Sequence, residues 1–176
     1  LHEPVLSAVP ERDAVGQILA HASQTKRVFG VRPAGTWLPH GVWDPSVPRI
    51  LARADMAWTL VDDRLIAPHG SVSGSYRTER EGWGAARVPM DARVRELVPD
   101  VPVKQVMSHL FRRGARGDRL VTIGLSGERF NNRRDQAWLA TLLVALGSAA
   151  DRLRTLTPSA AVAEGPQRAR IYLVSG

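Results

Sequence analysis

The chain has 176 residues, of which 44% are hydrophobic, with no cysteine and a formal net charge of +7. This length suffices for one domain over residues 1–176, and the lack of cysteine excludes disulfides and thiolate metal ligands and leaves the cytoplasm as the default location. No apolar run approaches the roughly 18 residues that a membrane span needs, so we expect no membrane partner.

The basic residues bear on a nucleic-acid function. They are almost all arginine, and they alternate with acidic residues, as in 77–81, instead of forming one basic face. The densest groups, 112–116 and 131–134, fall in expected loops without aromatic residues. We therefore expect no nucleic-acid partner, and we expect these side chains to be exposed and dispersed: Arg112, Arg113, Arg133 and Arg134.

The first half of the chain predicts alternating helices and strands. Residues 11–29 carry apolar positions at helical spacing and two acidic residues in the first turn. A strand over 36–39 follows, then a helix that begins near Ser46, then a continuous apolar strand over 57–61. A strand reached through a crossover helix is typical of a parallel sheet that is buried on both faces.

Polar residues follow both of these strands. His40 comes directly after the first strand, and Asp62 and Asp63 come after the second. The carboxyl ends of parallel strands are where α/β folds carry their sites, so we expect these side chains at one rim. Trp37 and Trp58 lie within the strands, and we expect both to be largely buried.

The second half of the chain continues the pattern. We expect a long rim loop over 64–89, helices over 90–97, 102–111 and 135–146, a strand over 119–124, a loop over 157–167 and a last strand over 170–174. The strands 36–39, 57–61, 119–124 and 170–174 are expected to be parallel, which gives an α/β fold.

Several motifs in chain order carry a resemblance to a known family. In the first half, W-L-x-E is similar to residues 37–40, V-W-x-P to 42–45 and Y-x-x-x-D-D to 58–63. In the second half, I-D-E-K-L-R-x-L-I-P is similar to residues 90–99, H-D-D-G-E-K-F-G to 124–131 and Y-L-P-T-A-S-Y to 172–175. The match runs along nearly the whole chain. It is similar to the catalytic barrel of glycoside hydrolase family 57, most closely to its α-amylase and 4-α-glucanotransferase branch.

The resemblance implies a parallel-stranded α/β fold, a partial or degenerate (β/α)7-type barrel. A complete eight-unit barrel needs roughly 250 residues, and the chain begins with Leu1 instead of Met, so we expect a part of a longer barrel. The resemblance also implies a role in carbohydrate metabolism, with an α-glucan or maltooligosaccharide as partner. No feature of the sequence identifies a protein partner.

The resemblance places two catalytic carboxylates at positions that lack them here. The nucleophile, the Glu of W-L-x-E, falls at His40, and the general acid and base, the second Asp of H-D-D-G-E, falls at Ser126. A retaining glycosidase needs two carboxyl groups about 5 to 5.5 Å apart, so His40 and Ser126 are vestigial positions and we expect an inactive homologue. The residues left for glucan binding are Trp37, His40, Asp63 and Glu128.

Each candidate also has a structural interpretation. His40 can bond a neighbouring carbonyl, Asp63 can cap a turn, and Trp37 can belong to the core. Three functions stay open: an inactive family 57 homologue with or without glucan binding, an active glycosidase that has relocated its chemistry to Glu128 and Asp63, and a basic module for nucleic acid or another polyanion.

A metal site from His40, Asp63 and His69 lacks the spacing of metal ligands, so we expect no metal or other cofactor.

Overall fold

The computed structural model describes residues 4–38, 41–69, 73–164, 167–171 and 173. The helices are α1 (Glu11–Phe29), α2 (Val47–Arg53), α3 (Ala92–Leu97), α4 (Val103–Ala115), α5 (Arg133–Ser148) and α6 (Pro158–Glu164), and the strands are β1 (Gly35–Trp37), β2 (Trp58–Asp62), β3 (Ser75–Arg80), β4 (Trp83–Met90) and β5 (Gln167–Arg170). Short 3-10 helices are η1 (Leu6–Ala8), η3 (Asp63–Leu65), η4 (Ala67–His69) and η5 (Gly127–Phe130).

The strands form one mixed, mostly parallel sheet in the order β1-β2-β4-β3-β5. β1, β2 and β4 run parallel to one another, whereas β3 is antiparallel to β4 and parallel to β5. Gly35 lies opposite Trp58 in this register, and a Cβ on Gly35 would come within 2.1 Å of the Trp58 ring. The close pairing of β1 with β2 therefore requires a glycine at this position. The expected α/β class with a parallel sheet is confirmed.

The predicted rim loop over 64–89 is wrong in its second half, because that segment contains the hairpin of β3 and β4. Glu81 and Gly82 form its turn with positive φ angles of 54° and 83°. β4 is then the central strand of the sheet, although it contains Arg87 and Pro89. Arg87 is fully buried because its guanidinium stacks on the Trp43 ring at 4.6 Å and donates to the Ile171 carbonyl oxygen.

Three further expectations need correction. Residues 119–124 are not a strand: a single parallel bridge joins Thr122 to Met90, and the Asp91 N–H donates to the Thr122 carbonyl at 2.9 Å. The expected loop over 157–167 contains α6, because Thr157 accepts the first turn's hydrogen bond from the Ala161 N–H at 2.9 Å. The last strand is β5, earlier than the predicted 170–174, and it runs parallel only to β3.

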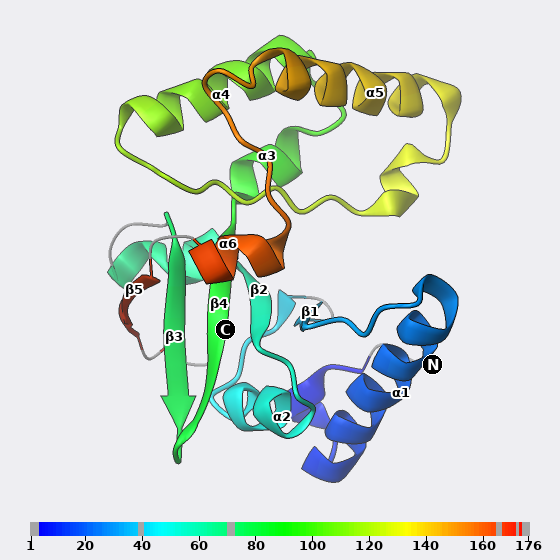
Figure 1. Ribbon diagram of the computed structural model, residues 1–176, viewed down its shortest axis with the longest axis vertical. Coiled ribbons are helices and arrows are strands. Elements are labelled where there is room, and N and C mark those ends of the chain that lie inside the picture. The colour runs from blue at the N-terminus through cyan, green and yellow to red at the C-terminus, as the bar shows by residue number, and fades with distance from the viewer. Residues whose placement is uncertain (1–3, 39–40, 70–72, 165–166, 172, 174–176) are drawn as a thin grey trace.

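Three apolar clusters hold these elements together. One cluster joins α1 and α2 to one face of the sheet, and a small one places α6 over Leu60 and Val88 on the other face. The third cluster lies among α3, α4 and α5. In Figure 1, α4 and α5 lie side by side above the sheet, whereas α1 and α2 lie at its lower end.

Trp37 and Arg113 are placed differently from the prediction. Trp37 is 38% exposed because β1 is an edge strand, and Trp58 is half-buried under α6, where its indole N–H donates to the Ser159 hydroxyl at 3.1 Å. The prediction of burial is therefore wrong for Trp37, whereas Trp58 packs against the cluster of Leu60 and Val88 and is only partly exposed. Arg112, Arg133 and Arg134 are exposed as predicted, whereas only 12% of the Arg113 side chain is exposed.

Candidate functional site at the strand ends

The carboxyl ends of β1, β2 and β4 lie at one edge of the sheet, because the three strands are parallel and in register. Trp37 ends β1, Asp62 ends β2 opposite Met90, and Met90 ends β4. The segment after Thr122 joins this edge through its bridge to Met90. The structure therefore brings Trp37, Asp63 and the segment that leads to Ser126 to one edge, as the sequence predicts.

Gly124 is closely packed at this edge. A Cβ there would lie 2.4 Å from the Met90 sulfur and 3.1 Å from the Trp37 ring. The resemblance places a histidine of H-D-D-G-E at this position. Because the fully buried Met90 fills the space, a side chain at position 124 would have to displace it.

Asp62 is neutralised by two arginines. Its carboxylate accepts from the Arg64 side chain at 2.8 and 2.9 Å and from Arg95 at 2.6 Å. The hydrogen bonds from Arg64 are the main cause that lowers the pKa of Asp62 below its ordinary value. This carboxylate stays ionised and paired, so it is a structural anion that fixes the start of η3.

Asp63 has the opposite electrostatic setting. Its carboxylate accepts one hydrogen bond, from the Ala92 N–H at 3.3 Å, and desolvation raises its pKa above the ordinary value, with Asp91 and Asp62 adding to the increase. A raised pKa and a half-buried position are properties of a general acid, although the same bond also lets Asp63 cap the first turn of α3.

Asp91 is the centre of a buried polar cluster that the sequence analysis missed. It follows β4 directly and caps α3, accepting from the Val94 N–H at 2.9 Å. It also binds His109 Nε2 at 2.7 Å and Arg113 Nη1 at 2.6 Å. If residues 83–90 are recognised as a strand, Asp91 directly follows a strand end and becomes a candidate site residue by the same rule as Asp63. Arg113 is buried because it joins Asp91 to Asp118.

Ser126 and Glu128 lie at the start of η5 and are exposed. Ser126 precedes η5 without a side-chain cap, and its carbonyl accepts from the Arg129 N–H at 3.2 Å. Their side chains are not held by the network of Asp62, Asp63 and Asp91. His40 lies outside the described residues, as does the His69 side chain, so the expected approach of His40 to Ser126 stays a prediction.

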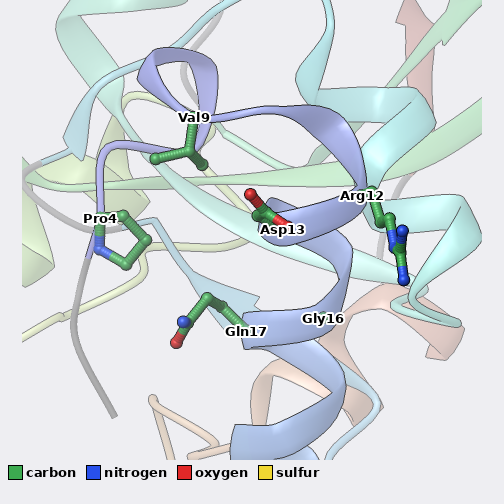
Figure 2. A pocket seen from close by; sticks show the side chains of 6 residues that line it. All are labelled: Pro4, Val9, Arg12, Asp13, Gly16 and Gln17. Atoms are coloured by element: carbon green, nitrogen blue, oxygen red, sulfur yellow. The ribbon is translucent and has the colours of Figure 1, made fainter.

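The remaining described residues add two observations. No group of three or more His, Asp or Glu residues there is placed to hold a metal ion, and no helix there is long and apolar enough to cross a membrane. An open hollow of about 500 Å³ lies between η1 and α1, lined by Pro4, Val9, Arg12, Asp13, Gly16 and Gln17 (Figure 2). None of the predicted site residues lines it.

The chain is similar in sequence to known α-amylases. The chain is 25% identical over 154 residues to α-amylase 1 of Dictyoglomus thermophilum, covering 81% of this chain and 22% of that protein. It is 31% identical over 134 residues to an α-amylase of Pyrococcus abyssi, covering 73% and 20%. The chain thus spans about a fifth of the length of these relatives.

The fold is also similar to a solved structure. The crystal structure of 4-α-glucanotransferase from Thermococcus litoralis superposes with a TM-score of 0.87 and 26% identity, covering 98% of this chain and 29% of that one. The family model of glycosyl hydrolase family 57 matches residues 1–174. On this match, the chain belongs to glycosyl hydrolase family 57.

Proposed function

We propose that this chain forms part of an α-glucan-binding face that has lost the chemistry of a retaining glycosidase. The resemblance puts a serine at position 126 in place of the acid and a histidine at position 40 in place of the nucleophile. A serine hydroxyl has no usable acidity near neutral pH, and a neutral imidazole cannot stabilise a developing cation as a carboxylate does.

The observation that carries the proposal is the bonding of the carboxylates at the strand ends. Asp62 is held by Arg64 and Arg95, and Asp91 is held by His109 and Arg113. Each of these anions is already balanced by a cation, which suits a structural role. Balanced carboxylates lack the free charge that a nucleophile needs.

Trp37 is the residue that suits glucan binding best. It ends β1 at the strand-end edge, it is 38% exposed, and its ring rests on Gly124. An exposed aromatic face at the carboxyl edge of a parallel sheet is a platform for the apolar face of a sugar ring.

The test of glucan binding compares Trp37→Ala with Trp83→Ala. Trp83 is 45% exposed and begins β4 at the opposite edge, so it is a matched control. Titration with maltoheptaose is expected to show binding that Trp37→Ala weakens about fivefold and Trp83→Ala leaves unchanged, since an aromatic contact is worth about 1 kcal/mol. Equal binding by both variants would remove Trp37 from the site, and no binding by the native chain would end the proposal.

The raised pKa of Asp63 favours a second candidate function. In this alternative, Asp63 serves as the general acid and Glu128 as the second carboxylate of an active glycosidase. Asp63→Asn and Glu128→Gln would then each abolish turnover of maltooligosaccharides. If glucan binds without turnover, the alternative fails while the binding proposal stands.

A further inference from the structure

A hollow of about 330 Å³ lies between α3 and α4, away from Trp37 and Gly124. Arg93 and Leu97 line it from α3, and Lys104, Gln105, Ser108, His109 and Arg112 line it from α4. The α4 residues lie on one side of the helix because they recur at spacings of three and four. Two helices thus direct three cations into one concave site.

Within the part of the chain that the structure describes, these three cations form no ion pair with a carboxylate. No ion pair between described residues involves Arg93, Lys104 or Arg112, and no acidic residue lines the hollow. The carboxylates close in sequence to Leu97 are paired with other arginines: Glu96 with Arg64 at 3.2 Å, and Asp100 with Arg129 at 2.9 Å.

The buried cluster next to the hollow cannot balance these charges either. Asp91 already bonds the Val94 N–H, His109 and Arg113. His109 therefore lines the hollow with one ring nitrogen already held by Asp91. Three like charges in one concave site repel one another, and an anion that binds there relieves this repulsion.

We propose that this hollow binds a phosphate group, either as inorganic phosphate or as the phosphate of a small ester. Guanidinium groups bind phosphate with paired N–H donors, and the ammonium of Lys104 adds a point charge. Ser108 and Gln105 supply neutral donors, and Leu97 supplies an apolar contact for the organic part of an ester.

The composition of the hollow favours a small ligand over a nucleic acid. None of its lining residues is an aromatic residue on which a base could stack, apart from His109, whose ring is tied to Asp91. Recognition of single strands relies on such stacking along an extended basic groove. Here the three cations surround one site.

Calorimetric titration in phosphate-free buffer tests the proposal on the native chain. The ligands are inorganic phosphate, glucose 1-phosphate and, as a neutral comparison, glucose. We expect phosphate and glucose 1-phosphate to bind once per chain and glucose not to bind at this site. Tighter binding of glucose 1-phosphate would assign the source to an ester, and equal affinities would assign it to the phosphate group alone; both support the proposal.

A triple variant removes the three cations by the substitutions Arg93→Gln, Lys104→Gln and Arg112→Gln. We expect it to bind phosphate at least about tenfold more weakly than the native chain, because charge-assisted hydrogen bonds are lost. The matched control replaces Arg27, Arg133 and Arg134 with Gln, which removes the same charge from exposed positions elsewhere. Its affinity is expected to stay native. If circular dichroism shows that the first variant is unfolded, Lys104→Gln alone, at an exposed position, serves for the comparison.

Three results would overturn the proposal. The first is equal loss of phosphate affinity in both triple variants, which would reflect net charge alone. The second is the absence of saturable binding of phosphate and of glucose 1-phosphate. The third is binding of a single-stranded oligonucleotide that depends on Arg93, Lys104 and Arg112 while the small phosphates do not bind, which would make the hollow part of a nucleic-acid surface.

Discussion

At the scale of single residues, the strand ends are organised by carboxylates in contrasting surroundings. Asp91 is 3% exposed and is bonded to a backbone N–H, an imidazole and a guanidinium. Asp100 is 74% exposed at its side chain and is bonded to Arg129. The difference in burial decides what each ion pair contributes to stability.

Replacing Asp91 with Asn is expected to destabilise the fold strongly. The change leaves Arg113 with Asp118 as its remaining ion-pair partner in a buried setting, and breaking a buried pair costs about 3 kcal/mol. Asp100→Asn removes an exposed pair and is expected to cost less than about 1 kcal/mol. Urea unfolding of both variants measures the difference, and equal midpoints would contradict the role of Asp91.

The neighbours Asp62 and Asp63 are expected to affect stability with opposite dependence on pH. Because the pKa of Asp62 is lowered in the fold, it contributes stability above its unfolded pKa that is lost as the pH falls through the folded pKa. Because the pKa of Asp63 is raised, the native state holds its proton longer, and ionisation costs stability as the pH rises through that folded pKa.

Unfolding of Asp62→Asn and Asp63→Asn at pH values between about 3 and 7 tests this difference. Relative to the native chain, Asp62→Asn should lose stability as the pH rises, and Asp63→Asn should gain it over the same range. Parallel curves for the two variants would contradict the assignment of Asp63 as a desolvated carboxylate.

At the scale of elements, the segment 119–124 shows why apolar sequence alone does not define a strand. Its Val121 and Ile123 pack against the cluster of α3, α4 and α5, and one bridge joins the segment to β4. The segment is held to the sheet edge by packing at Gly124 between Met90 and Trp37.

Gly124→Ala is therefore expected to destabilise the fold by about 1 to 3 kcal/mol, since the new methyl group overpacks against Met90. Gly127→Ala, three residues on, is the control, because a Cβ there meets nothing within 4 Å. Thermal unfolding compares the two. A Gly124→Ala variant as stable as Gly127→Ala would show that Met90 moves aside at little cost.

The elements that could be predicted from the sequence are those with a clear period. α1 matches the expected 11–29, and α5 lies within a few residues of its predicted position because its apolar residues recur at helical spacing; β2 lies within one residue of the continuous apolar run that predicts it. β4 could not be predicted, because Arg87 and Pro89 interrupt its pattern, and Arg87 is accommodated through two contacts distant in sequence, with the Trp43 ring and with the Ile171 carbonyl oxygen.

The candidate site could be predicted only where its residues belong to segments with a recognisable local pattern. Asp63 was identified because it follows a recognised strand, and Trp37 was identified because it belongs to the motif that resembles W-L-x-E. Asp91, His109 and Arg113 were missed because their association depends on the end of β4 and on the docking of α4, which no local pattern contains.

At the scale of the whole molecule, a family 57 fold carries a strand-end site in which arginines bind the carboxylates of Asp62 and Asp91. The match over residues 1–174 and the TM-score of 0.87 establish the fold relationship. The positions that the resemblance assigns to catalysis hold His40 and Ser126. The central claim is therefore that the family fold persists here without its glycosidase chemistry.

Turnover of maltoheptaose by the purified chain tests this claim most directly. Losing both catalytic carboxylates removes at least about 10⁴ in rate, so we expect no hydrolysis or transfer above background by chromatography of the products. His40→Glu combined with Ser126→Asp is the positive comparison and is expected to restore a measurable rate where the barrel is complete. Sustained turnover by the native chain that disappears in Glu128→Gln would contradict the claim.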